Sequence, residues 1–229
     1  MTQPRRGLGD GALPPWREPA ARAVFRLLPS EVLCYVDTAE RAFALTFDDG
    51  PSPSTTPALL DVLARHAARA TFFLIGERVH GNEAIVRRIA ADGHELANHL
   101  MRDERSVFLP AVRFRHELAH VKALLGRYGP IAWVRPGSGW FTPAMLRAAS
   151  RQEMRIVLGT VAAMHTGGPG DERITSMLAG EIRPGTIVVL HEGTAARRGV
   201  VATTDELLAR LGEQGLVAVT ISELVALGR

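Results

Sequence analysis

The chain has 229 residues, of which 46% are hydrophobic and 22% charged, as is ordinary for a globular protein with one medium-sized core. Its formal net charge is +3, and no run of basic residues is interleaved with aromatics, so nucleic-acid binding is not expected. The single cysteine, Cys34, excludes an internal disulfide and a cysteine-based structural zinc site.

Residues 1–40 form an N-terminal lead in which arginines interrupt every apolar stretch. No segment of signal-peptide or membrane-span length is visible there, so the default expectation is a cytoplasmic protein without a transmembrane segment. We expect residues 1–11 to be disordered and residues 19–28 to form a short amphipathic helix.

Residues 41–229 show short apolar runs typical of buried strands, separated by segments with helical periodicity. The apolar runs are residues 42–47, 70–75, 94–98, 131–136, 155–161, 185–191 and 216–221. The helical segments are residues 55–67, 82–93, 111–129, 142–152, 171–182 and 201–215, with Gly93, Gly129 and Gly215 expected as C-caps. This alternation predicts a single α/β domain with a parallel sheet, either closed into a barrel or open and doubly wound.

Residues capable of chemistry follow several of these strands. Asp48 and Asp49 end the first strand, His99 follows the third, Arg135 ends the fourth and His191 ends a late one. In either architecture, functional residues gather at the carboxyl ends of parallel strands. We therefore expect these five side chains to share one site.

A metal site is one interpretation of His99 and Asp103, which are four residues apart and share a face if this stretch is helical. With a carboxylate from the end of the first strand, they would give two oxygen ligands and one nitrogen ligand and leave positions open for water. The alternative interpretation is that His99 caps a helix and Asp103 pairs with a surface arginine.

Four motifs in order carry a resemblance to a known family: TFDDGP at 46–51, GHELANH at 93–99, RPGSG at 135–139 and VVLHEG at 188–193. They resemble the polysaccharide deacetylases, the NodB-homology fold of carbohydrate esterase family four. The resemblance spans residues 41–225. It implies a single-domain distorted β/α barrel and a hydrolase that removes an N- or O-linked acetyl group from a carbohydrate with one divalent metal.

The resemblance also implies a role for each matching position. Asp48 would be the general base, Arg135 the residue that orients it, and His191 the general acid. The metal ligands would be Asp49, His99 and Asp103. The substrate pocket would include Pro51, Gly137, Ser138, Gly139, Trp140 and Leu190.

Two departures from the family pattern affect these expectations. Asp103 stands where the family usually has a second histidine, so the ligand set with a divalent ion is formally neutral rather than positive. We expect a weaker Lewis acid, with preference shifted from zinc toward manganese, cobalt or iron. The fourth family motif, an Asp and Trp pair that holds the catalytic histidine, is missing from residues 158–168, where His165 or Thr166 are the candidate replacements.

Two alternative functions stay open. One is carbohydrate binding without catalysis, and the other is the same chemistry on a small amide or ester metabolite. The expected partner is accordingly a carbohydrate or a small acylated substrate, and the sequence does not specify an oligomeric state.

Overall fold

The computed structural model describes residues 31–163, 172–194 and 197–228. The helix expected over residues 19–28 lies outside the described residues. Among the helices of the described part, none combines the length and apolar character that a membrane crossing requires.

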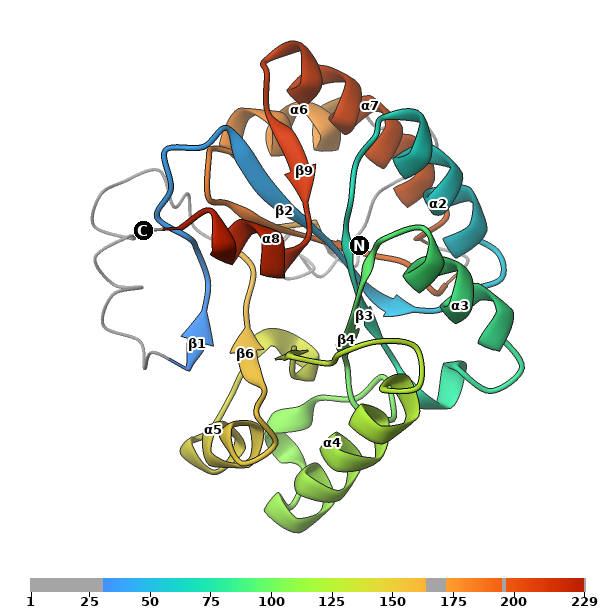
Figure 1. The fold of residues 1–229 in the computed structure, drawn as a ribbon, viewed down its shortest axis with the longest axis vertical. Coiled ribbons are helices and arrows are strands. Elements are labelled where there is room, and N and C mark those ends of the chain that lie inside the picture. The colour runs from blue at the N-terminus through green and yellow to red at the C-terminus, as the bar shows by residue number, and fades with distance from the viewer. Residues whose placement is uncertain (1–30, 164–171, 195–196, 229) are drawn as a thin grey trace, which may run out of the picture.

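Nine strands form one sheet, which curls into a half-barrel (Figure 1). The strands are β1 (Val32–Leu33), β2 (Ala42–Gly50), β3 (Thr71–Leu74), β4 (Glu95–Asn98), β5 (Trp133–Val134), β6 (Arg155–Val157), β7 (Val161–Ala162), β8 (Ile187–His191) and β9 (Val217–Val219). Their order is β1-β6-β5-β4-β3-β2-β8-β7, and β9 pairs with the start of β2. The strand pairings are parallel, as both expected architectures require. Because the sheet curls into a half-barrel (Figure 1), the distorted β/α barrel is confirmed and the doubly wound alternative is not.

Helices connect the strands and cover the outer face of the sheet, except for the last helix (Ile221–Ala226), which packs against the inner face (Figure 1). They are α2 (Thr56–Arg65), α3 (Glu83–Ala91), α4 (Ala111–Leu125), α5 (Pro143–Ser150), α6 (Glu172–Glu181), α7 (Val200–Glu213) and α8 (Ile221–Ala226). Single-turn 3₁₀ helices follow some of the strands: η1 (Gly76–Arg78), η2 (Ser106–Phe108) and η3 (Gly137–Gly139).

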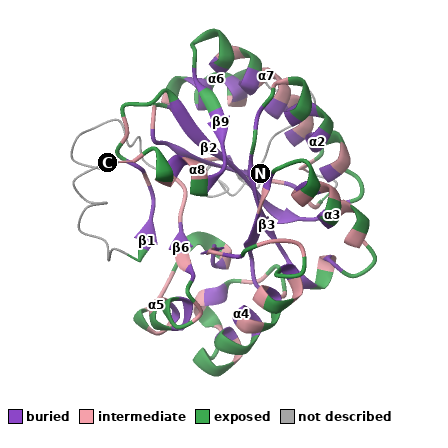
Figure 2. Ribbon diagram, in the orientation of Figure 1, coloured by how far each residue is buried: buried purple, intermediate pink, exposed green. Residues whose placement is uncertain are grey.

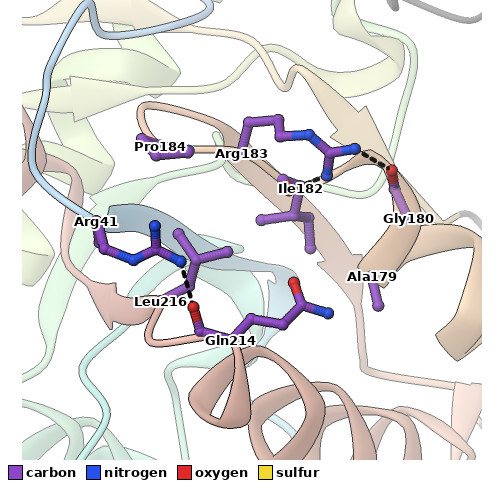
Figure 3. Close-up of a pocket in the computed structure, with 8 residues that line it drawn as sticks. All are labelled: Arg41, Ala179, Gly180, Ile182, Arg183, Pro184, Gln214 and Leu216. Atoms are coloured by element: carbon purple, nitrogen blue, oxygen red, sulfur yellow. Dashed lines mark hydrogen bonds between the residues drawn. The ribbon is translucent and has the colours of Figure 1, made fainter.

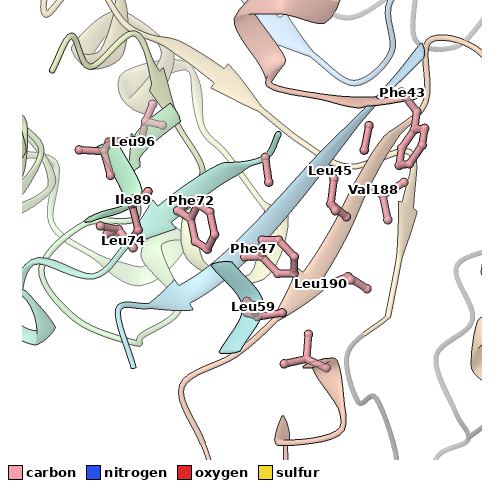
Figure 4. Packing of buried hydrophobic residues seen from close by; sticks show 14 of the residues in the cluster. Phe43, Leu45, Phe47, Leu59, Phe72, Leu74, Ile89, Leu96, Val188 and Leu190 are labelled. Atoms are coloured by element: carbon pink, nitrogen blue, oxygen red, sulfur yellow. The ribbon is translucent and has the colours of Figure 1, made fainter. Parts of the chain in front are cut away.

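The alternation of side chains along β2 separates two cores and places the first aspartate. All nine residues of this strand are buried (Figure 2). Phe43, Leu45 and Phe47 point into the larger core beneath the helices (Figure 4). The alternate residues face the interior of the half-barrel, where Ala42 and Ala44 belong to a second cluster with Phe73, Ala97, Trp133, Val157, Ile187 and Leu224 of α8. Asp48 continues this inward-facing series to the carboxyl end of the strand.

The structure differs from the sequence expectations at four places. The run 155–161 divides into β6, which pairs with β1 and β5, and β7, which pairs with β8. Gly159 lies between them, packed so tightly that a Cβ there would overlap Val189. Helix α4 ends at Leu125 with Gly126 as its C-cap, so the expected cap at Gly129 is wrong. Strand β1 and helix α8 were not expected.

Candidate active site

The two adjacent aspartates lie at the carboxyl end of β2, where its pairing with β3 contains a bulge. Asp48 pairs with Phe73 and Gly50 with Leu74, so Asp49 is the extra residue on β2. Its backbone φ of 68° falls in the left-handed region. Neighbouring residues on a regular strand point to opposite faces, but a bulge redirects the side chain it carries. The bulge therefore leaves both carboxylates in one site.

Asp48 forms a buried ion pair with Arg135, which follows β5. Arg135 Nη1 lies 2.5 Å from Asp48 Oδ1 and 2.9 Å from the hydroxyl of Thr46. Arg135 Nε donates to the Val157 carbonyl at 3.2 Å, and the guanidinium carbon lies 4.0 Å from the centre of the Phe73 ring. These contacts from several strands fix the guanidinium and hence the carboxylate of Asp48.

Asp49 faces His99, which follows β4, and is also bound by an arginine. The distance from His99 Nε2 to Asp49 Oδ1 is 3.2 Å, and Arg197 donates to Asp49 Oδ2. The other ring nitrogen of His99, Nδ1, lies 2.7 Å from the carbonyl oxygen of Arg135. Because a carbonyl can only accept, Nδ1 carries a hydrogen and Nε2 is directed at Asp49.

Two opposing effects, burial and the charges of neighbouring groups, set the pKa values of Asp49 and His99. Burial favours a neutral Asp49, but the hydrogen bond and charge of His99 and the charges of His191 and Arg197 outweigh it, so the pKa of Asp49 lies well below its usual range. Burial likewise favours a neutral His99, but the charges of Asp48 and Asp49 and the bond to Asp49 raise the pKa of His99. Both shifts favour the charged forms, a carboxylate on Asp49 and an imidazolium on His99.

His191, the last residue of β8, completes the polar cluster. Its Nε2 lies 3.9 Å from Asp48 Oδ2, and its Nδ1 lies 3.1 Å from the carbonyl oxygen of Ala163. This backbone acceptor orients the ring in the absence of the family aspartate. The candidate replacements His165 and Thr166 lie outside the described residues.

Asp103 is separated from the other two predicted metal ligands. Its side chain is 51% exposed, and its Oδ2 lies 3.5 Å from Nη2 of Arg78. Arg78 also donates to the main-chain carbonyl of Asp49, so one guanidinium links the two aspartates. In the described part of the chain, no three His, Cys, Asp or Glu side chains are grouped so as to hold a metal ion. The structure brings Asp49 and His99 together, and the ligand set of Asp49, His99 and Asp103 stays a prediction.

Glu192, which we did not predict for the site, lies buried directly behind it. The Thr55 hydroxyl donates to Oε2 at 2.6 Å, and the Thr56 hydroxyl lies 2.8 Å from both carboxylate oxygens. A Cβ on Gly50 would overlap Oε1, so only glycine fits at that end of β2. Burial raises the pKa of Glu192 to about 7, against the two hydroxyl hydrogen bonds and the charge of Arg78.

The predicted pocket residues fall into two groups. Pro51 is buried. Leu190 is fully buried in the larger core, near Phe47 (Figure 4). Ser138, Gly139 and Trp140 are exposed on the loop after β5, and Gly137 is half-buried. The loop residues therefore border the open end of the site, whereas Leu190 supports it from below.

A separate pocket of about 430 Å³ lies at the opposite, amino-terminal end of the strands (Figure 3). Its two arginines bind carbonyl groups at helix ends. Arg183 donates to Gly180 in the last turn of α6 and to Ile182 directly after it, and Arg41 donates to Gln214 and Gly215 after α7. These contacts are C-terminal caps. We assign this pocket a structural role.

Comparison with known proteins places the chain in a family. The sequence profile of the family described as "Polysaccharide deacetylase" matches residues 35–157. The chain is 32% identical over 194 residues to a peptidoglycan-N-acetylglucosamine deacetylase of Bacillus cereus, covering 83% of this chain and 91% of the relative. It is 36% identical over 156 residues to a chitooligosaccharide deacetylase of Bradyrhizobium, covering 67% and 71% of the two chains.

Solved structures agree with these sequence matches. A peptidoglycan N-acetylglucosamine deacetylase superposes with a TM-score of 0.81 at 28% identity, covering 87% of this chain and 95% of the other. An acetyl xylan esterase from Clostridium thermocellum in complex with a cobalt ion gives 0.74 at 28% identity, covering 81% and 91%. A mutant of a pseudoenzyme of the CE4 family with restored activity gives 0.79 at 25% identity, covering 88% and 74%. The chain belongs to the polysaccharide deacetylase family.

Proposed function

We propose that the protein removes N-linked acetyl groups from N-acetylglucosamine residues of peptidoglycan or of chitooligosaccharides. The observation that carries this proposal is that the adjacent aspartates have different partners. Asp48 is bound by Arg135 and faces His191, whereas Asp49 faces His99. The names of the relatives support the substrate class.

Asp48 is proposed as the general base. Its Oδ1 is occupied by Arg135, while its Oδ2 faces His191 and is the oxygen left to accept a proton from water. The attacking water oxygen forms a bond to the acetyl carbon as its proton passes to Asp48. The ion pair holds the carboxylate in one orientation and offsets the cost of burying its charge.

His191 is proposed as the general acid. With Nδ1 donating to the Ala163 carbonyl, Nε2 is the nitrogen that faces the site. A proton on Nε2 would pass to the departing amine nitrogen as the bond between the acetyl carbon and that nitrogen breaks. The products are acetate and a free amine on the sugar, so atoms and protons balance.

We further propose that Asp49 and His99 hold a divalent metal ion, with Asp103 as a third ligand once it leaves Arg78. A bound ion would lower the pKa of a water and polarise the acetyl carbonyl. The cobalt ion in the acetyl xylan esterase structure supports a divalent ion, and zinc, manganese or iron are the other candidates. On this chain, Arg197 must also release Asp49 Oδ2 for that oxygen to become available.

Acetate release tests the proposal. The protein is stripped with a chelator, reloaded with zinc, manganese, cobalt or iron, and incubated with chitooligosaccharides and with peptidoglycan. We expect metal-dependent acetate release that falls at least 100-fold in Asp48→Asn and in His191→Ala, whereas His80→Ala, whose side chain is 99% exposed, serves as the control. Wild-type protein that releases no acetate with any of these ions would refute the proposal.

Two added measurements, oligosaccharide binding and hydrolysis of a small aryl acetate, separate the two alternatives. The salt bridge from Arg197 to Asp49 favours a catalytically impaired relative, because it occupies an oxygen that the metal would need. That function would appear as oligosaccharide binding without acetate release. A deacylase of small metabolites would hydrolyse a small aryl acetate but leave both glycans intact.

A further inference from the structure

The part of the chain that contains α4 and α5 concentrates positive charge. Residues 105–152 include eight of the 27 lysines and arginines but only one of the 24 acidic residues, Glu117. Because the whole chain has a formal net charge of only +3, the remainder is net negative. Glu117 is buried and pairs with Arg113 at 2.7 Å, so it gives the exposed surface of this region no negative charge.

The exposed residues of α4 recur every three or four positions and so lie on one side of the helix (Figure 2). From α4 into the turn after it, they include Val112, Arg115, His116, His120, Ala123 and Arg127. Helix α5 packs beside α4 (Figure 1), and Lys122 of α4 donates to the carbonyl of Gln152 just after α5. Arg147 of α5 and its C-cap Arg151 are exposed as well. We call Arg115, Arg127, Arg147 and Arg151 the basic face.

The arginines of the basic face lack acidic partners, unlike exposed arginines on other helices. Four arginines elsewhere, with side chains at least 36% exposed, each pair with a carboxylate: Arg65 with Asp205, Arg69 with Glu223, Arg88 with Asp61, and Arg210 with Glu172. Within the described residues, no arginine of the basic face forms an ion pair. Cations grouped without counter-charges repel one another and attract an anionic partner.

Exposed apolar side chains border the basic face at the start of α4. Phe108, the last residue of η2, is 76% exposed, and Val112 in the first turn of α4 is 68% exposed. Val112 lies three residues before Arg115 and therefore on the same side of the helix. A soluble polyanion would satisfy the charges alone. The surface of an anionic bilayer offers both negative headgroups and an apolar layer beneath them, so it matches both kinds of side chain.

We propose that the basic face binds the anionic headgroups of a lipid bilayer, with Phe108 and Val112 entering the headgroup layer. This inference goes beyond the proposed function and does not depend on it. Peripheral binding of this kind strengthens with the buried apolar area and with the attraction between basic side chains and anionic lipids. Phe108 and Val112 follow the carboxyl end of β4, and Ser106 of the same loop accepts from the main-chain N–H of Gly137. Docking would therefore bring the end of the sheet that carries the site toward the bilayer.

Vesicle sedimentation tests the proposal. The partition coefficient of the full chain is measured on vesicles of phosphatidylcholine alone and on vesicles with roughly 30% phosphatidylglycerol. We expect binding to the anionic vesicles only, and raising NaCl from about 0.1 M to about 0.5 M should weaken it at least about 10-fold. This salt comparison uses the unaltered protein, so it does not depend on the folding of any variant.

Substitutions locate the binding surface. A variant with Arg115→Gln, Arg127→Gln, Arg147→Gln and Arg151→Gln should bind anionic vesicles at least about 30-fold more weakly. Phe108→Ser combined with Val112→Ser should weaken binding at least about 5-fold. The control replaces Arg65, Arg69, Arg88 and Arg210 by glutamine, which makes the same change in net charge, and its binding should stay within about 3-fold of wild type.

Three outcomes would overturn the inference. Wild-type protein that does not sediment with anionic vesicles would exclude a bilayer as the partner. Equal losses in the two fourfold arginine variants would show that net charge, and not the basic face, attracts the protein. Binding to a soluble single-stranded oligodeoxynucleotide that requires the basic face, without binding to vesicles, would assign this surface to a soluble polyanion instead.

Discussion

Nη1 of Arg135 lies 2.5 Å from Oδ1 of Asp48, and the two side chains are only 4% and 3% exposed. Such a pair loses its hydration on folding, and the mutual attraction of the two charges offsets that cost only while both are present. The pair therefore gives the proposed base a fixed orientation. Each charge can be buried without a large free-energy cost only while the other charge is present.

A double-mutant cycle should reveal this dependence. Asp48→Asn and Arg135→Met each leave one charge buried and unpaired, and each should lower the free energy of unfolding by about 3–5 kcal/mol. Because the double variant leaves neither charge, its loss should be smaller than the sum by about 2 kcal/mol or more in urea unfolding. The exposed pair Arg88–Asp61 is the control and should couple by less than about 1 kcal/mol. A buried pair that couples no more strongly than this control would contradict the interpretation.

Gly193 is expected to be irreplaceable for reasons of space rather than of backbone conformation alone. Gly193 and Gly81 both have positive φ, at 90° and 80°, so alanine strains the backbone at either position. A Cβ on Gly193 would lie 2.5 Å from the carbonyl oxygen of Asp49 and would overlap Arg78, whereas a Cβ on Gly81 would meet nothing within 4 Å.

Gly81→Ala should therefore cost about 1 kcal/mol, and Gly193→Ala at least about 2 kcal/mol more. Gly193→Ala should also reduce acetate release at least 10-fold, because the bulge at Asp49 must move. Urea unfolding and initial rates of the two variants decide the point. Equal stability of the two variants would show that the space around Gly193 relaxes freely.

The succession of most strands and helices along the chain, and the end of the sheet that carries the site, could be predicted from the sequence, because both depend on local signals. Apolar runs of strand length identify the strands, and the carboxyl-end rule gathers Asp48, His99, Arg135 and His191. Helix α8 had a signal that we overlooked: Thr220 and Glu223 form a capping box immediately after β9. Strand β1 has only two residues, which is too short for periodicity to reveal.

The remaining features of the site depend on contacts between distant parts of the chain. The bulge at Asp49 is set by pairing with β3 and by the carboxylate of Glu192 against Gly50. Arg197 reaches Asp49 across 148 positions of sequence, and no spacing rule links such a pair. The group that orients His191 is a main-chain carbonyl, and every residue carries one, so no residue type could have indicated it.

Glu192 should make stability depend on pH in a defined window. Its pKa is about 7 in the folded protein, against 4.5 for an ordinary glutamate. Below pH 4.5 both states hold the proton, but between pH 4.5 and 7 the unfolded chain loses it while the folded protein keeps it, so stability falls as pH rises. The loss should be roughly 3 kcal/mol.

Glu192→Gln removes this titration but keeps the size and an acceptor oxygen for the threonines. The free energy of unfolding is measured in urea from pH 4 to pH 8 for both proteins. We expect the wild type to lose stability relative to Glu192→Gln over pH 4.5–7 and the difference to level off above that range. Parallel curves throughout would show that Glu192 does not hold its proton on folding.

Arg197 should compete with a divalent ion for Asp49. Its guanidinium binds Asp49 Oδ2, and its side chain is only 15% exposed, so solvent screens this charge weakly. An ion that takes this oxygen must break the salt bridge and approach a positive charge. Arg197→Ala removes both obstacles and should tighten binding of manganese or zinc about 10-fold, equivalent to 1.4 kcal/mol.

Calorimetric titration of chelator-treated protein checks this expectation without reference to activity. Arg198→Ala removes the neighbouring exposed arginine and controls for the change in net charge. His99→Ala should abolish binding in either background, because it removes a ligand and thereby shows that the titrated ion lies in this site. Unchanged affinity in Arg197→Ala would mean that the ion binds away from Asp49 Oδ2. A gain confined to Arg197→Ala would instead identify this arginine as the residue that sets how readily the site accepts its metal.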